Sequence, residues 1–391
     1  MPTNARIINM NLFEAAIAIN LPSRSRPMYS TPAQSPATFA SMTTYYCRNM
    51  EEALQRAKAA GKRPGCFYGG IVLRSGKKGF AVYREGKVVE QYSAYLSRKC
   101  RTFVSMKVCV IGGANVDITA ASFQAFRPGD SNPGRVHVSW GGVGRNIAHN
   151  LVLLGDEVEL LTIFGGGLFG PVIEAACRDI GIGTKYTEIA AEGTNSYFVS
   201  INDADGEMLG GVADMRSIEG MDAAWLGKRL PVINASDAVV ADSNLSPEAL
   251  AFLIDHCTKP LYLDAVSVAK AARIREAVER SEKKTFFALK CNALEAEILA
   301  DLPGVERFYE TAGADGLKVH ADGKTEAFPA LPTRVVNVTG GGDALLAGIV
   351  HAGPGADIQT AARWGLACAR CAVESKHAVS EEIKNLKRPK R

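Results

Sequence analysis

Three consecutive glycines, Gly340, Gly341 and Gly342, stand directly before Asp343 in this 391-residue sequence. The mostly β-branched residues 335–338 before them predict the end of a buried strand, and the Ala- and Leu-rich run after them predicts a helix. Glycines at a strand-to-helix turn leave N–H groups uncovered, and these groups together with the helix dipole can bind an anion such as phosphate. A carboxylate beside that anion can take the proton of a hydroxyl that attacks a phosphoryl group. An aspartate at a helix start can also serve only as a cap, so other motifs must decide between these roles.

A second pair of polar side chains, Asn292 and Glu295, is spaced by one helical turn. Two oxygen-bearing side chains at this spacing can reach the same point, directly or through water. Mg²⁺ suits such a pair because it keeps most of its waters and binds few protein oxygens. A solvated helix start is the alternative interpretation of the same residues.

Short polar side chains also follow a predicted strand at 107–111, where Asn115 and Asp117 could fork onto vicinal hydroxyls. A capped turn is the alternative there. Further along, a glycine-rich turn allows close approach of a ligand, and Asn146 at the following helix start would bond a sugar hydroxyl. A tight turn alone would need the same glycines, which are Gly141, Gly142 and Gly144.

From Met106 onward, apolar strand patterns alternate with helical patterns, which favours a mostly parallel sheet covered by helices on both faces. Ligands of such a sheet bind at the carboxyl ends of its strands, where the polar motifs fall. Two shorter strand patterns, 135–139 and 194–212, interrupt the alternation and predict a small separate sheet that acts as a lid.

The composition is that of a globular protein, with 47% hydrophobic and 22% charged residues and a net charge of +4. We expect neither a nucleic-acid nor a membrane partner, because the small charge excess lies mostly at the C-terminus and no apolar run could span a bilayer. Nine scattered cysteines indicate a reducing compartment and no disulfide framework.

The first 105 residues differ from the rest. Residues 1–49 are poor in acids and rich in Arg, Ser, Thr and Pro, which is typical of an organelle transit peptide or of a disordered leader. Residues 50–105 predict a small accessory β-meander of unknown role. We therefore expect a cytoplasmic protein, or an organellar one if the leader is a transit peptide, with a core domain at 106–382 and a basic tail at 383–391.

Several stretches, in a shared order, resemble the PfkB (ribokinase-like) carbohydrate and nucleoside kinases, and those at 130–134 and 141–146 point to the pseudouridine branch of that family. The stretches are 112–117, 130–134, 141–148, 242–246, 264–267, 290–297 and 335–350. The resemblance implies a doubly wound α/β kinase domain with a small β lid. It also implies ATP-dependent phosphorylation of the 5′-hydroxyl of pseudouridine, with Mg²⁺, a possible monovalent cation, and a possible homodimer through the lid strands.

The resemblance assigns a role to each candidate residue. Asp343 would be the base, and the amides of Gly340, Gly341 and Gly342 would stabilise the transferred phosphoryl group. The substrate would be bound by Asn115, Asp117, Ser131, Asn132, Gly141, Gly142 and Asn146. The nucleotide would contact Asn292, Thr311, Gly313, Gly316 and Thr339, and the metal would lie near Asn292 and Glu295.

Three departures from the family pattern keep alternatives open. Residues 165–170 spell G-x-G-x-x-G, which would suit a dinucleotide and an oxidoreductase. Cys291 replaces the proline usual before Asn292, and the 298–310 region is short. Besides an oxidoreductase, the alternatives are a kinase of another sugar or nucleoside and a nucleotide-binding protein that has lost catalysis.

Overall fold

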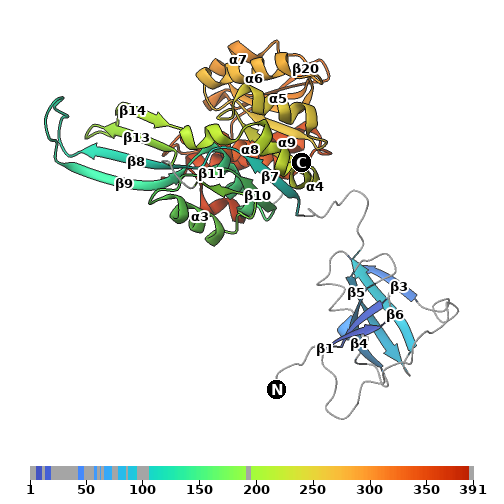
Figure 1. Cartoon of the computed structure of the whole chain (residues 1–391). Helices are drawn as coiled ribbons and strands as arrows, with labels where there is room; N and C mark the ends of the chain where they lie inside the picture. Colours follow the sequence, from blue (N-terminus) through green and yellow to red (C-terminus); the bar gives the residue numbers. More distant parts are fainter. Residues whose placement is uncertain are drawn as a thin grey trace. The chain divides into compact units, whose positions relative to one another are not determined.

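The computed structural model describes residues 6–10, 14–18, 43–47, 57–59, 62, 66–72, 78–84, 87–94, 105–190 and 195–386. The chain forms two compact units, Met1–Val104 and Ser105–Arg391, drawn in Figure 1. Most of the predicted leader and residues 387–391 of the predicted tail lie outside the described residues. Among the described helices, none combines the length and the apolar character needed to cross a membrane.

The first unit contains a six-stranded sheet in the order β1-β2-β4-β5-β6-β3. The predicted meander is its central part, since β4, β5 and β6 pair antiparallel in sequence order. The strand bounds are β1 Arg6–Met10, β2 Glu14–Ala18, β3 Thr43–Cys47, β4 Cys66–Val72, β5 Lys78–Arg84 and β6 Lys87–Ala94. The transit-peptide interpretation of residues 1–49 stays a prediction.

The second unit is built on an eight-stranded sheet in the order β10-β7-β15-β16-β17-β18-β19-β20. The first six strands are parallel and the last two antiparallel, which confirms the mostly parallel sheet. The bounds are β7 Lys107–Ile111, β10 Glu157–Leu161, β15 Ala238–Asp242, β16 Leu261–Asp264, β17 Phe286–Asn292, β18 Val305–Thr311, β19 Leu317–Ala321 and β20 Lys324–Phe328.

Helices cover both faces of this sheet because its strands are apolar on both sides. In β7, Val108 and Val110 pack on one face, while Cys109 and Ile111 pack on the other, as the two-residue period of a strand requires. The first face packs against α2 Val143–Leu153, α3 Gly170–Asp179, α8 Gly341–Ala352 and α9 Ile358–Val373. The second packs against α4 Ala223–Ala235, α5 Pro247–His256, α6 Val268–Arg280 and α7 Ala293–Leu299.

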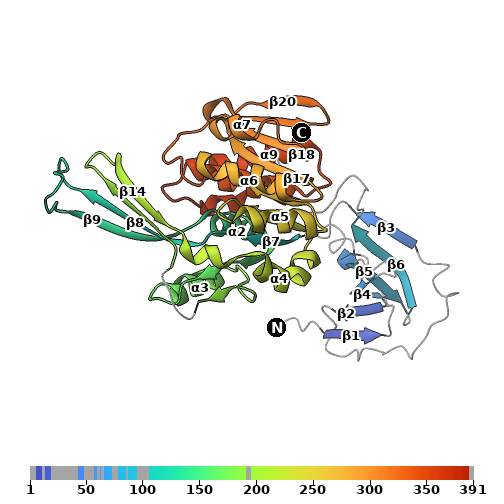
Figure 2. The ribbon, with the colours of Figure 1, turned by 45° about the horizontal axis from the view of Figure 1, so that its top comes forward.

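The predicted small sheet is present, with four strands in the order β14-β13-β8-β9. In Figures 1 and 2 its long hairpin of β8 and β9 projects away from the main sheet. The bounds are β8 Asn115–Ser122, β9 Gly134–Gly141, β13 Tyr197–Asn202 and β14 Met208–Asp214. The short elements are the strand pair β11 Ile163–Phe164 and β12 Glu188–Ile189 and the 3-10 helices η2 Arg216–Gly220, η3 Gly313–Asp315 and η4 Glu381–Asn385.

One alternative interpretation and one local prediction are wrong. Asn115 and Asp117 lie inside β8, paired with β9, and do not form a capped turn. Residues 335–338 form no strand, and Val338 is 75% exposed. The run instead lies at the end of α9, where the amides of Val336 and Asn337 bond to the carbonyl of Val373.

Candidate active site

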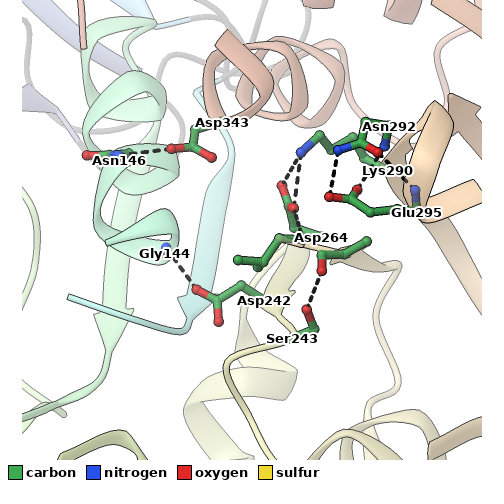
Figure 3. Close-up of polar contacts among 11 residues, drawn as sticks. Gly144, Asn146, Asp242, Ser243, Asp264, Lys290, Asn292, Glu295 and Asp343 are labelled. Carbon is green, nitrogen blue, oxygen red and sulfur yellow. Dashed lines mark hydrogen bonds and ion pairs between the residues drawn. The ribbon is translucent and has the colours of Figure 1, made fainter. Parts of the chain in front are cut away.

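Asp343 lies in the first turn of α8 and is 8% exposed. The helix begins after Gly340, whose φ of 81° is in the left-handed region that favours glycine. The side-chain amide of Asn146, on α2, donates a hydrogen bond of 2.9 Å to Oδ2 of Asp343. Figure 3 shows Asp343 between α2 and a second polar cluster around Lys290.

That second cluster is built by the ends of neighbouring parallel strands. Asp242 ends β15 and Asp264 ends β16, and the two residues are paired in register. Lys290 on β17 donates to both carboxylate oxygens of Asp264, at 3.0 and 3.1 Å. Both aspartates are buried, at 1% and 0% exposure, because the sheet ends under the covering helices.

Burial and charge shift the titration of this cluster. Burial, followed by the charge of Asp264, raises the pKa of Asp343 to about 7, while Lys290 and Asn146 act in the opposite direction. For Lys290, burial alone would lower the pKa, but the negative charges of Asp264 and Asp343 outweigh it and raise the pKa. A carboxyl that titrates near neutrality is suited to general-base chemistry.

The first turn of α8 lies against the cluster around Lys290. A Cβ on Gly342 would lie only 2.8 Å from Nζ of Lys290, so the ammonium packs directly on the backbone there. The Gly341 amide donates to Val338, and the Ala344 amide bonds back to Gly340. The amides of Gly342 and Asp343 therefore have no acceptor inside the helix and can donate to an anion.

The other predicted glycines also allow close approach. A Cβ on Gly141 would lie 2.0 Å from a carboxylate oxygen of Asp117. Gly142 has φ of 99° and touches the carbonyl of Gly113. The amides of Gly113 and Gly144 both donate to Oδ2 of Asp242, at 2.8 and 2.9 Å. These contacts join the ends of β7 and β9 and the start of α2 to the aspartate cluster.

Asn292 and Glu295 contact each other in a capping box at the start of α7. The Asn292 side-chain oxygen accepts from the Glu295 amide at 2.9 Å, and the Glu295 carboxylate accepts from both nitrogens of Asn292 at 2.8 Å. Within the described residues there is no group of three or more His, Cys, Asp or Glu side chains that could hold a metal ion.

Four of the predicted nucleotide contacts, Asn292, Thr311, Gly313 and Gly316, lie at or just after the carboxyl ends of β17 and β18. Thr311 ends β18 and is paired in register with Asn292. Gly313 and Gly316 begin and end the turn around η3 with positive φ, and the Thr339 amide bonds to the side chain of Asn337. Gly340 lies against the carbonyl of Ala378.

Ser131 and Asn132 are not brought to Asp343. They lie in the connection between β8 and β9, at the far end of the projecting hairpin in Figure 2. The Asn132 side chain is bonded within its own loop, to the backbone of Arg127 and Asp130. A role in substrate binding stays a prediction for these two residues.

Comparison with known proteins identifies the family. The model of the pfkB family carbohydrate kinases matches residues 105–384. The chain is 34% identical over 263 residues to the pseudouridine kinase of Escherichia coli strain K12, with coverage of 62% of this chain and 82% of the relative. The chain belongs to the pfkB family. It is a phosphotransferase that acts on a hydroxyl group.

The chain is also similar to two further proteins. A guanosine-inosine kinase of Exiguobacterium acetylicum is 28% identical over 199 residues, covering 50% of this chain and 64% of the relative. The solved structure of a carbohydrate kinase from Agrobacterium tumefaciens is 30% identical with a TM-score of 0.63, covering 72% of this chain and 96% of that one. The fold of this pfkB kinase is thus that of a solved carbohydrate kinase.

Asp242, Asp264 and Lys290 were not predicted from the sequence as site residues of this kinase. A usable signal was present, since both aspartates end buried apolar strands and Lys290 interrupts one. Polar groups at the carboxyl ends of adjacent parallel strands converge, but the adjacency of β15, β16 and β17 follows only from the strand order.

In this pfkB kinase the glycine-rich stretch 165–170 does not lie where a dinucleotide-binding motif would lie. It follows β11, which pairs only with β12, whereas a dinucleotide motif follows a strand of the main sheet. A Cβ on Gly170 would lie 1.8 Å from the carbonyl oxygen of Gly165, so at least one glycine serves the tight turn before α3.

Proposed function

We propose that this kinase transfers the γ-phosphoryl group of ATP to the 5′-hydroxyl of pseudouridine. The observation that carries the proposal is the 34% identity to a pseudouridine kinase over 82% of its length, with Asp343 buried at a helix start as a phosphoryl-transfer base would be. The choice of pseudouridine as the acceptor is supported by the sequence identity alone. The assignment of Asp343 as the base is supported by the geometry of the site.

Asp343 would accept the proton of the attacking hydroxyl through Oδ1, because Oδ2 is held by Asn146. The amides of Gly342 and Asp343 would donate to the oxygens of the transferred phosphoryl group. Lys290 lies against Gly342, so its ammonium adds positive charge beside those amides while Asp264 holds it in place. These groups are fixed before the substrates bind, which lowers the cost of reorganisation during transfer.

The acceptor would lie between β8 and the start of α2. Asp117 and Asn115 on β8 would accept and donate hydrogen bonds to the ribose hydroxyls, with the bare backbone of Gly141 and Gly142 against the ring. Closure of the four-stranded sheet over the sugar would exclude water and limit hydrolysis of ATP.

Asn292 and Glu295 fit a magnesium ion that is held mainly through waters and phosphate oxygens. Each Glu295 oxygen accepts a single hydrogen bond within the capping box, which leaves lone pairs for a bound water. When bound, Mg²⁺ would neutralise negative charge on the phosphates.

The full chain should be assayed for ATP-dependent phosphorylation of pseudouridine, uridine, ribose, adenosine, inosine and guanosine. Selective transfer to pseudouridine is the expected result. Transfer to another acceptor would retain the mechanism and overturn the substrate. Binding of ATP without transfer to any acceptor would favour the alternative of a nucleotide-binding protein that has lost catalysis.

A purine nucleoside is the second candidate acceptor, because a relative at 28% identity is a guanosine-inosine kinase. The assay separates the two, since inosine and guanosine carry a bicyclic base where pseudouridine carries a single ring. Preference for inosine or guanosine over pseudouridine would replace the first proposal.

A further inference from the structure

Arg145 is a buried cation in the first turn of α2, with 7% of its surface exposed. Its Nη1 donates to the carbonyl of Trp140 at 2.8 Å and lies 3.5 Å from Oδ1 of Asn146. In the described part of the chain its Nε has no hydrogen-bond partner. Burial of a guanidinium with an unsatisfied N–H is costly, so a function for the charge is expected.

The charge acts on Asp117. The Arg145 guanidinium donates to the carbonyl of Trp140, and the Asp117 carboxylate lies against Gly141, the next residue of β9, where a Cβ would be 2.0 Å from a carboxylate oxygen. The two charges therefore flank the peptide between Trp140 and Gly141. Burial raises the pKa of Asp117 to about 6, and the charge of Arg145, followed by the hydrogen bond from Asn115, opposes that rise. In turn Cys177 and, after it, the charge of Asp117 oppose the lowering of the Arg145 pKa that burial causes.

Among the described residues that the neighbouring strands place beside Asp117, the others bring no charge. Asn115 on the same strand offers a neutral amide, β9 offers Ser139 and the backbone of Gly141, and β13 places Phe198 in register with it. Arg145 is thus the cation that balances this carboxylate among the described elements packed against it.

We propose that Arg145 is a positioning residue for the acceptor: its buried guanidinium keeps Asp117 a carboxylate, so that Asp117 can accept hydrogen bonds from two substrate hydroxyls. This rests on the proposed function, which puts the sugar against Asp117. An ionised carboxylate accepts at both oxygens, whereas a protonated one must donate at one of them and loses the stronger charge-assisted bonds. Arg145 does not touch the acceptor in this arrangement.

The test compares the KM for the acceptor from pH 5.5 to 9 in wild type, Arg145→Met and Arg145→Lys. Arg145→Met should raise that KM about tenfold at pH 7, because loss of a neighbouring opposite charge moves a carboxyl pKa up by roughly 1–3 units. The KM should return toward the wild-type value near pH 9, where Asp117 ionises without help. Arg145→Lys keeps a positive charge and should keep most of the wild-type affinity at pH 7.

Asp117→Asn is the matched control, since its acceptor KM should be high at every pH and should not change further when Arg145→Met is added. The KM for ATP should stay within about twofold in the Arg145 variants, because the acceptor alone meets Asp117. An acceptor KM that rises equally at all pH values in Arg145→Met would indicate a merely structural role and overturn the proposal. An unchanged KM at pH 7 would overturn it too.

Failure of the proposed function would give a result different from failure of the role proposed for Arg145. The acceptor used is the one that wild type phosphorylates best, or pseudouridine if wild type phosphorylates none, and its dissociation constant is also measured by calorimetry, which needs no turnover. An acceptor that binds with the expected pH dependence but is not phosphorylated would contradict the proposed function alone. If Arg145→Met does not fold, Arg145→Gln, which can still donate to the Trp140 carbonyl, carries the same expected pH-dependent loss.

Discussion

The side-chain amide of Asn146 donates a 2.9 Å hydrogen bond to Oδ2 of Asp343 and so joins the first turns of α2 and α8. The two residues are 197 positions apart in the sequence. Because α2 begins at the glycines beside Asp117 and α8 begins at the proposed anion site, this bond connects the acceptor end of the site to the phosphoryl end. It also holds the Asp343 carboxylate in one orientation.

Replacement of Asn146 by Ala should lower kcat at pH 7 by about tenfold, the scale of a lost hydrogen bond to a charged group. The Asn146 bond lowers the pKa of Asp343, so its loss should raise that pKa and move the acid limb of kcat to higher pH. Rate measurements from pH 5.5 to 9 check this. Asn385→Ala, at an exposed position of η4, should change neither quantity, and an unmoved acid limb in Asn146→Ala would contradict the assignment.

Asp343→Asn should leave the dissociation constants of ATP and acceptor near wild type and lower kcat by a factor on the order of 10² or more, because the amide cannot take the proton. Single-turnover kinetics with calorimetry measure both. Asp322→Asn is the matched control, since Asp322 lies in the exposed turn between β19 and β20 with φ of 51°, a conformation that Asn tolerates. Wild-type turnover in Asp343→Asn would show that another group is the base.

The wild-type pH profile should have two separable acid limbs. Burial and Asp264 raise the pKa of Asp343 to about 7, so kcat should fall as the pH drops through 7 and the base becomes protonated. Burial raises the pKa of Asp117 to about 6, so the acceptor KM should rise only below that pH. A kcat that stays constant from pH 5.5 to 8 would contradict a base with a raised pKa, provided that chemistry limits the rate.

The main sheet could be predicted from the sequence because its strands are short apolar runs that end in polar residues. Val108 and Cys109 are adjacent in β7 and are buried on opposite faces of the sheet. A strand that is buried on both faces is apolar throughout and shows no alternation of apolar and polar residues. The same logic failed at Val336 and Val338, which are β-branched but exposed. Residue type predicts that a segment could be a strand, but a free strand edge must also be in reach, and that depends on the whole topology.

The site could be predicted only in part for a similar reason. Asp343 and the glycines before it are adjacent in the sequence, so their geometry follows from one strand-to-helix turn. Lys290, Asp264 and Asn146 come from three separate segments, and only the order of the strands and the packing of α2 against α8 bring them together. The sequence predicted that Asn292 and Glu295 lie one helical turn apart. It did not predict that they hydrogen-bond to each other in a capping box.

Glu295→Gln should raise the Mg²⁺ concentration needed for half-maximal activity by about tenfold, the lower end of the range for groups that orient metal ligands. The amide also weakens the capping box, so the melting temperature should fall slightly. Activity titrated with free Mg²⁺ at saturating ATP measures the effect. Glu297→Gln, on the exposed side of the same helix, should leave the Mg²⁺ dependence unchanged. Equal Mg²⁺ curves for Glu295→Gln and wild type would remove Glu295 from the metal site.

Gly340→Ala should lower both the melting temperature and kcat, because the new Cβ would lie 2.0 Å from the carbonyl oxygen of Ala378 and must displace the start of α8. Gly206→Ala is a matched control: it also has a positive φ, of 89°, but open space around its Cβ. The control should cost about 1–2 kcal/mol from backbone strain alone and leave kcat unchanged. Gly340→Ala should be destabilised clearly more than that, since strain and overlap add. Thermal unfolding and rate assays on both variants measure these effects. Equal losses of melting temperature in Gly340→Ala and Gly206→Ala would mean that the segment at Ala378 moves aside without cost and does not fix the start of α8.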